Sequence, residues 1–214
     1  MEFYTVGKIN DIMNIQEINE KLHGRSPEEI VQWAVQQAKR PCITTNFRPY
    51  ESAILHLVTE IVPTIDVIWC DTGYNTPDTY RHAKELIDRL QLNIHIYVPK
   101  QSVGYRDVLL GIPHVDSPEH SIFSEQVKLE PFRRAMEEHQ PDVWFTNLRM
   151  GQTDFRDAID IVSVGKDGEL KISPFYSYSD ADLDSYLEKH DLPNYSKYYD
   201  PTKALGNREC GIHQ

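Results

Sequence analysis

Apolar residues along this chain follow two patterns that alternate from residue 41 onward. Short continuous apolar runs, with the length and composition of buried strands, occupy residues 41–45, 67–70, 94–98 and 142–146. Apolar residues at helical spacing occupy 14–22, 27–38, 51–61, 77–90, 125–139 and 179–190. This strand–helix–strand rhythm predicts a parallel sheet that is flanked by helices and joined by right-handed crossovers.

Local sequence motifs predict the start of one helix and the turn of one hairpin. Ser26, followed by Pro27 and Glu29, predicts a capping box with proline at the first helical position. Apolar runs at 160–164 and 169–172 flank a short turn that has glycine at both ends, and this predicts a hairpin.

The periodicity predicts a single α/β domain over residues 1–192, with N-terminal helices in residues 1–40. Residues 103–124 carry a mixed signal and predict loops with one short helix. After Pro193 the chain becomes rich in Tyr, Lys and Asn without periodicity, so we expect 193–214 to be a flexible tail. A length of 214 residues suits one domain with a substantial core.

Composition narrows the class of protein. The chain is 40% hydrophobic and 26% charged, as expected of a globular domain, and has no apolar run long enough to span a membrane. Its start lacks the order of a secretory signal, and three widely spaced cysteines fit a reducing cytoplasm. The net charge of −11 argues against a nucleic-acid partner, although local arginines can still bind a small anion.

Polar residues follow three predicted strands, at 44–52, 71–75 and 147–156. Open α/β sheets bind ligands at the carboxyl ends of their strands, where strand order reverses. Hydroxyls and free backbone N–H groups at a strand–helix junction suit an anion, and arginine pairs bidentately with phosphate or sulfate oxygens. The candidate binding residues are Thr44, Thr45, Asn46, Arg48, Ser52, Asp71, Thr72, Gly73, Lys128, Arg149, Gln152 and Arg156.

The same residues could instead have purely structural roles. Arg48 can be solvated, and Asp71 can serve as a turn former or helix cap. Arg149 and Arg156 can form ion pairs with the many acidic residues, and Lys128 can do the same.

Cys210 lies five positions from the end of the chain, between Arg208 and His213. Neighbouring positive charge lowers the pKa of a thiol and so favours the nucleophilic thiolate. Cys42 and Cys70 lie in apolar strand contexts, so we expect them to be inert core residues.

The sequence lacks the motifs of NTPases, dinucleotide-binding proteins and zinc sites. The sequence has no G-x-x-x-x-G-K loop and no G-x-G-x-x-G, which excludes the common NTPase and dinucleotide sites. Cys210-x-x-His213 is half of a zinc site without a second pair at suitable spacing, so we expect no metal there.

Taken in order, these segments resemble the phosphoadenylyl-sulfate (PAPS) reductase family from about Pro41 to the terminus. The matching blocks are Ile68-Trp-Cys-Asp-Thr-Gly-Tyr-Asn-Thr-Pro-Asp-Thr-Tyr80, Lys128-Leu-Glu-Pro-Phe132, Leu148-Arg…Gln152…Arg156 and Arg208-Glu-Cys-Gly-Ile-His213. The resemblance implies a Rossmann-like fold of the adenine nucleotide alpha-hydrolase-like kind that binds a nucleotide. It also implies a mobile C-terminal tail that carries the reactive cysteine.

The chain departs from the family pattern at three positions. Arg48 stands where the family's phosphate loop usually carries glycine. Asn147 stands where glycine is frequent, and Met150 where a second arginine is frequent.

Family relatives that reduce adenylyl sulfate bind a four-iron cluster through a Cys-Cys pair and a later Cys-x-x-Cys. The corresponding stretch here, 121–127, has no cysteine, and three cysteines in the whole chain are too few for four thiolate ligands. The resemblance therefore favours the branch without an iron–sulfur cluster.

By this resemblance the thiolate of Cys210 attacks the sulfur of PAPS, assisted by Arg208 and His213, and thioredoxin then releases sulfite. A homodimer acting in cytoplasmic sulfate assimilation is the family expectation. Three alternatives stay open. They are an adenylyl-sulfate reductase lacking a cluster, an ATP-pyrophosphatase-like adenylating enzyme, and a non-catalytic nucleotide sensor, which the changes at Arg48 and Met150 would favour.

Overall fold

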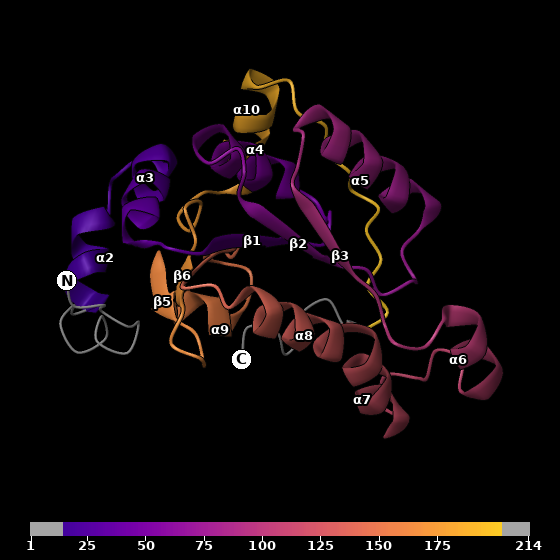
Figure 1. The fold of residues 1–214 in the computed structure, drawn as a ribbon. Helices are drawn as coiled ribbons and strands as arrows, with labels where there is room; N and C mark the ends of the chain where they lie inside the picture. The colour runs from indigo at the N-terminus through magenta and orange to yellow at the C-terminus, as the bar shows by residue number, and fades with distance from the viewer. Residues whose placement is uncertain (1–14, 203–214) are drawn as a thin grey trace.

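A six-stranded sheet runs through the centre of the protein (Figure 1). The structure is a computed structural model that describes residues 15–202. The strands are β1 (Pro41–Thr45), β2 (Asp66–Cys70), β3 (Ile94–Tyr97), β4 (Val143–Phe145), β5 (Val162–Val164) and β6 (Leu170–Ile172). They are arranged in the order β3-β2-β1-β4-β6-β5, and each neighbouring pair is parallel except β5 and β6.

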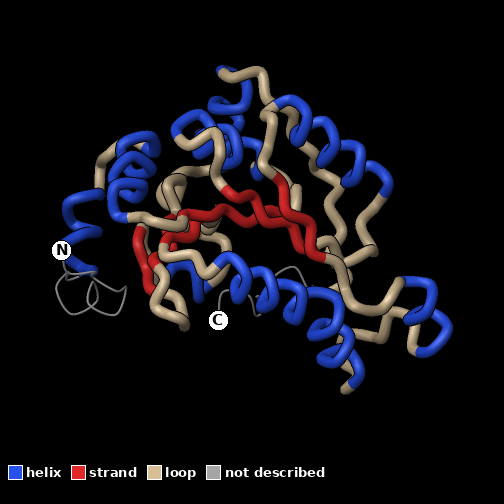
Figure 2. The backbone as a smooth tube through the Cα atoms, in the orientation of Figure 1, coloured by secondary structure: helices blue, strands red, loops and turns tan. Residues whose placement is uncertain are grey.

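Helices cover both faces of this sheet, as Figure 2 shows in blue around the red strands. They are α2 (Ile15–Leu22), α3 (Pro27–Gln37), α4 (Glu51–Ile61), α5 (Pro77–Arg89), α6 (Val103–Leu109), α7 (Glu119–Ser124), the π-helical turn η1 (Glu125–Leu129), α8 (Glu130–His139), α9 (Asp154–Asp157) and α10 (Asp180–Lys189). Within residues 15–202, no helix combines the length and apolarity needed to cross a bilayer.

Alternation along the strands divides the core into two parts. In β2, Val67 and Trp69 face the larger core, which is shared with helices α2, α3, α4, α5 and α10. Ile68 and Cys70 face the smaller core, where α8 contributes Phe132, Ala135 and Met136. A strand that is buried on both faces has a continuous run of apolar residues in its sequence. The parallel strands of this sheet could therefore be predicted from the sequence.

The local signals in the sequence are confirmed. The Ser26 side chain accepts a hydrogen bond of 3.2 Å from the Glu29 N–H, and Glu29 Oε2 accepts one of 2.8 Å from the Ser26 N–H. β5 and β6 form the expected antiparallel hairpin, in which Val162 pairs with Ile172.

The helix expected over 125–139 is confirmed, but its first turn is π-helical and not α-helical. The segment begins with the π-helical turn η1, in which the Glu130 N–H bonds the Glu125 carbonyl, and becomes α-helical only from Glu130. Pro131 follows at once, and proline has no N–H to donate to the preceding turn. A widened turn at this place puts Lys128 in a buried position.

The strand order reverses at the pair β1–β4. From β1 the chain moves through β2 to β3 on one side, and it then returns to place β4 on the other side of β1. The carboxyl ends of β1 and β4 therefore form the switch point at which open α/β sheets place their ligands.

Candidate active site

The loop after β1 is held by its own side chains. Thr45 Oγ1 accepts a hydrogen bond of 3.1 Å from the Phe47 N–H, and Asn46 Oδ1 accepts one of 3.2 Å from the Arg48 N–H. Phe47 and Tyr50 have φ of 55° and 67°, a left-handed conformation that non-glycine residues rarely adopt. The loop is thus a fixed, strained connection, and backbone strain of this kind is often found at functional sites.

Ser52 lies in the first turn of α4, directly after this loop. It is buried, and its Oγ has no hydrogen-bond partner among the described residues. A buried hydroxyl without a partner is uncommon and calls for an explanation such as a missing ligand. Thr44 is different, because its Oγ1 accepts a hydrogen bond of 2.9 Å from Trp144 Nε1.

Arg48 connects the loops after β1 and β4. Its Nε lies 2.9 Å from Glu51 Oε1, and its Nη2 donates a hydrogen bond of 3.0 Å to the main-chain carbonyl of Asn147. In return, Asn147 Nδ2 donates to the Tyr50 carbonyl at 3.2 Å. The structure therefore brings the first and third predicted segments together at the switch point.

Arg149, a predicted anion-binding residue, lies in the loop after β4 beside Tyr50. Its guanidinium lies 5.2 Å from the centre of the Tyr50 ring, while its Nη2 reaches the carboxylate of Asp180 at 2.7 Å. Arg149 is buried, yet its Nε has no hydrogen-bond partner among residues 15–202. The Asp180 side chain is 69% exposed, whereas the Arg149 side chain is 8% exposed, so the ion pair joins a buried cation to an exposed carboxylate.

Gln152 and Arg156 support the same loop. Gln152 Oε1 accepts from the Arg149 N–H at 3.3 Å and also from Arg156 Nη1. Arg156 is buried, and its main-chain carbonyl accepts a hydrogen bond of 3.0 Å from the Tyr176 hydroxyl. The hydrogen bonds of Gln152 and Arg156 thus help to fix the conformation of the loop after β4.

Asp71 organises the loop after β2. Its Oδ1 accepts hydrogen bonds of 2.9 Å from the Gly73 N–H, 2.8 Å from Asn75 Nδ2 and 2.9 Å from the Tyr80 hydroxyl. Thr72 Oγ1 accepts from the Tyr74 N–H at 3.2 Å. The turn needs glycine at position 73, because its φ is +81° and an added Cβ would lie 2.5 Å from Val103 Cγ2.

Lys128 is paired with the segment that leads toward the end of the chain. Its Nζ bonds the carboxylate of Asp200 and lies 3.3 Å from Thr202 Oγ1, and both charged side chains are buried. Burial opposes ionisation of Asp200, but the charge and hydrogen bond of Lys128 and the hydrogen bonds of Thr202 outweigh it and lower the pKa of the carboxyl. His120 adds a contact of 3.3 Å from Nε2 to the Pro201 carbonyl.

The three predicted catalytic residues, Arg208, Cys210 and His213, lie outside the described residues. Of the other cysteines, Cys42 is buried, and burial strongly raises the pKa of its thiol. Cys70 is half-buried, and burial raises its pKa to about 12, although Lys128 and Arg134 act in the opposite direction. Thiols with such pKa values are protonated and unreactive at neutral pH.

Sequence reasoning missed the acidic partners of the predicted cations. Glu51, Asp180 and Asp200 pair with Arg48, Arg149 and Lys128 respectively. No motif marks these acids, and only the folded chain shows the pairs. The roles of all the predicted site residues toward a ligand stay predictions.

The fold and this edge define an open α/β protein of the class that places its ligand at a topological switch point. Residues 40–211 match the profile of the phosphoadenosine phosphosulfate reductase domain. A phosphoadenosine 5'-phosphosulfate reductase of Xylella fastidiosa is 34% identical over 230 residues, which cover 94% of each chain. The chain therefore belongs to the PAPS reductase family, whose named relatives are oxidoreductases.

Solved structures agree with this assignment. The PAPS reductase from Candida auris, solved as a phosphate complex, is similar with a TM-score of 0.74 and 27% identity, and the match covers 84% of this chain and 87% of that chain. The FMN adenylyltransferase from Candida glabrata, solved with ATP, has a TM-score of 0.56 at 11% identity and covers 79% of this chain and 54% of that chain. This second likeness is one of fold alone.

Proposed function

We propose that this protein reduces PAPS to sulfite and adenosine 3′,5′-bisphosphate by way of an S-sulfonated cysteine. The proposal rests on Arg149, a buried guanidinium at the switch point whose Nε has no hydrogen-bond partner among residues 15–202 and whose ion-pair partner, Asp180, is exposed. Family membership supplies the substrate class, and the matched region extends beyond Cys210.

In the first step the Cys210 thiolate attacks the sulfur of PAPS. A sulfur–sulfur bond forms, the bond between this sulfur and the bridging oxygen breaks, and adenosine 3′,5′-bisphosphate leaves with the electron pair. Because the leaving group is a phosphate, the protein's main task is to align the reactants and to stabilise negative charge. Arg149 serves this task directly, and the Ser52 hydroxyl donates a further hydrogen bond.

Arg48, Gln152 and Arg156 hold the loops that carry these donors. Thr44, Thr45, Asn46, Asp71, Thr72 and Gly73 shape the neighbouring strand ends. In this proposal Arg208 and His213 stabilise the Cys210 thiolate.

In the second step a dithiol, for which we propose thioredoxin, attacks the Cys210 sulfur and expels sulfite. The second thiol of thioredoxin then attacks the mixed disulfide and regenerates the Cys210 thiolate. The two electrons that reduce the sulfate sulfur thus come from thioredoxin, which leaves as a disulfide. No bound cofactor is needed, and the raised pKa values of Cys42 and Cys70 argue against either as an internal resolving thiol.

The anchor at Asp200 supports the role of the tail. Residues 200–202 are held by Lys128 and His120. The eight residues from 203 to 210 can span at most roughly 28 Å, so Cys210 stays within that distance of the anchor. The flexible tail predicted over 193–214 is corrected for residues 193–202, because Asn194 accepts a hydrogen bond of 2.9 Å from the Tyr50 N–H and Asp200 pairs with Lys128. We propose that the rest of the predicted tail, which carries Cys210, follows a single domain. Homodimeric assembly and a place in cytoplasmic sulfate assimilation belong to the same proposal and rest on the family resemblance.

A turnover assay tests the proposal. Sulfite release is measured with PAPS and reduced thioredoxin, and adenylyl sulfate serves as the matched substrate that lacks only the 3′-phosphate. We expect release from PAPS by the wild type and by Cys70→Ser, and none by Cys210→Ser. Equal release by Cys210→Ser would refute the proposed nucleophile, and a preference for adenylyl sulfate would refute the proposed substrate.

A further inference from the structure

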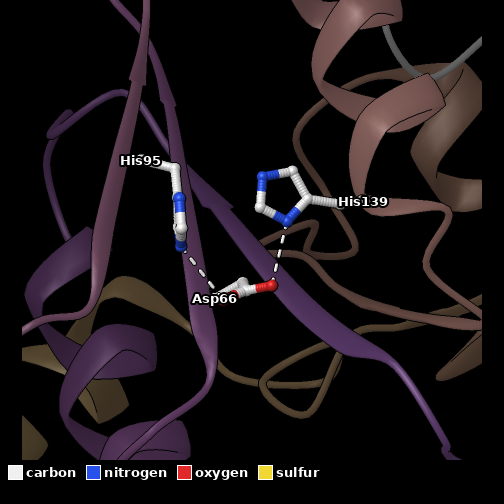
Figure 3. A group of neighbouring side chains, drawn as sticks. All are labelled: Asp66, His95 and His139. Atoms are coloured by element: carbon white, nitrogen blue, oxygen red, sulfur yellow. Dashed lines mark hydrogen bonds and ion pairs between the residues drawn. The ribbon is translucent and has the colours of Figure 1, made fainter.

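Two histidines and one aspartate form a cluster of neighbouring side chains (Figure 3). The cluster lies at the starts of β2 and β3, the opposite edge of the sheet from the candidate active site. Asp66 is the first residue of β2, His95 lies near the start of β3, and His139 is the last residue of α8. Three elements that are distant in sequence therefore meet at the amino-terminal ends of the strands. No residue of this cluster has a part in the proposed reductase chemistry.

Both imidazoles direct a nitrogen toward the same carboxylate, as Figure 3 shows. His95 Nε2 lies 3.0 Å from Asp66 Oδ1, and His139 Nδ1 lies 2.9 Å from Asp66 Oδ2. One ligand atom from each residue falls within 4.8 Å of the others. A tetrahedral zinc ion with bonds of about 2.0–2.1 Å holds its ligand atoms about 3.4 Å apart, so small side-chain rotations suffice to form the site.

The donor set and its surroundings suit a metal ion. Two imidazole nitrogens and a carboxylate oxygen are ligands that Zn²⁺ takes readily. Asn93 Nδ2 also donates a hydrogen bond of 2.9 Å to Asp66 Oδ1, and outer partners of this kind orient a ligating carboxylate. The side chains of Asp66 and His95 are 39% and 37% exposed, so an ion can enter from solvent.

The cluster also opens onto a hollow that leaves space for a further ligand. A cavity of about 450 Å³ is lined by Asp66 and His139 together with Glu138, the cationic residues Lys39 and Arg40, and residues of β1. A water molecule in this space can complete four-fold coordination, as in zinc sites with three protein ligands.

We propose that Asp66, His95 and His139 bind one Zn²⁺ ion, with water as the fourth ligand, and that this ion fastens the end of α8 to β2 and β3. Binding replaces the two imidazole–carboxylate hydrogen bonds by metal–ligand bonds and releases any proton that the rings still share with Asp66. The proposal stands independently of the proposed reductase activity, because its residues lie at the other edge of the sheet.

Metal titration of the full-length chain, free of any affinity tag, tests this proposal. The titration uses the double variant Cys210→Ser/His213→Gln as background, which removes the other Cys–His pair noted in the sequence. After treatment with a chelator, the protein is titrated with Co²⁺ and then with Zn²⁺. We expect one equivalent of Co²⁺ to produce visible d–d absorption without a sulfur-to-cobalt charge-transfer band, and Zn²⁺ to displace it.

Single substitutions in the same background identify the ligands. His139→Gln, His95→Gln and Asp66→Asn should each weaken Zn²⁺ binding by about 100-fold or more. His23→Gln is the matched control, because His23 Nε2 also lies 2.9 Å from an aspartate, Asp160, but belongs to no three-ligand cluster among residues 15–202. We expect this control to bind as the background does.

Three results would overturn the proposal. They are the absence of a d–d spectrum in the background protein, a charge-transfer band that reports a thiolate ligand, and unchanged affinity in His95→Gln. The His95 ring is partly exposed, so its substitution tests the ligand even if His139→Gln fails to fold. The thermal midpoint provides a second readout, which Zn²⁺ should raise in the background but not in His95→Gln.

Discussion

The Arg48 guanidinium donates a hydrogen bond of 3.0 Å to the main-chain carbonyl of Asn147, 99 residues away in the sequence. This bond joins the loops after β1 and β4 at the point where strand order reverses. By the sequence resemblance, the family's phosphate loop usually carries glycine at position 48, yet the left-handed conformations of this loop fall at Phe47 and Tyr50. The backbone at position 48 therefore does not require glycine, and the long Arg48 side chain connects the two loops.

We predict that Arg48→Met destabilises the protein by about 3 kcal/mol, because the buried carboxylate of Glu51 loses its ion-pair partner. The double variant Arg48→Met/Glu51→Gln should recover part of this loss, since it removes the unpaired charge. Urea denaturation of the wild type, both single variants and the double variant measures the coupling, for which we expect about 1–3 kcal/mol. Additive effects would show that the two side chains act independently.

The ion pair of Lys128 and Asp200 should make the free energy of unfolding depend on pH in the acidic range. The pKa of Asp200 is lowered in the folded state, so its contribution is fully present above the unfolded value of about 3.9 and is lost as pH falls through the folded value. Asp200→Asn should therefore cost stability at pH 7 and progressively less as pH falls below about 4. Urea denaturation from pH 7 to pH 2 compares the two proteins. A constant difference across this range would contradict the prediction.

Lys128→Met should be about as harmful as Asp200→Asn at neutral pH, because each variant leaves one buried charge without its partner. A loss of about 3–5 kcal/mol is typical when one partner of a buried pair is removed. Hydrogen exchange of the backbone at 200–202 would report whether this segment detaches. If neither variant loses stability at pH 7, the pair is not the main contact of this segment.

Thiol reactivity should separate Cys210 from the other two cysteines. With a pKa of about 12, Cys70 is ionised in roughly one molecule in ten thousand at pH 8, and Cys42 is buried. We predict that a thiol reagent modifies one cysteine rapidly in the native wild type and none in Cys210→Ser. Rapid modification of one thiol in Cys210→Ser would show that Cys70 or Cys42 is reactive.

Much of the fold is predictable from the sequence, because strands buried on both faces and capped helices leave local patterns. The runs that became β1, β2, β3 and β4 and the capping box at Ser26 are examples. The order of the strands is not predictable in this way, since it depends on pairings between distant segments. The π-helical turn before Pro131 also escaped prediction, because helical spacing alone does not distinguish it from an α-helix.

The candidate site is predictable only in outline. Polar residues after strands predict which edge of the sheet carries the candidate site, and the structure brings the loops of Arg48 and Arg149 together at one switch point. Their partners are not predictable, because Glu51 and Asp180 look like ordinary surface acids in the sequence. The cluster of Asp66, His95 and His139 likewise has no local signal, since each residue comes from a different element.

Mass spectrometry of the intact protein shows whether Cys210 accepts the sulfonate group of PAPS. After mixing with PAPS, the wild type should gain the mass of one sulfonate, and reduced thioredoxin should remove it. Cys210→Ser should never gain this mass, while Cys70→Ser should behave as the wild type. A wild-type protein that binds the nucleotide but stays unmodified would contradict the account.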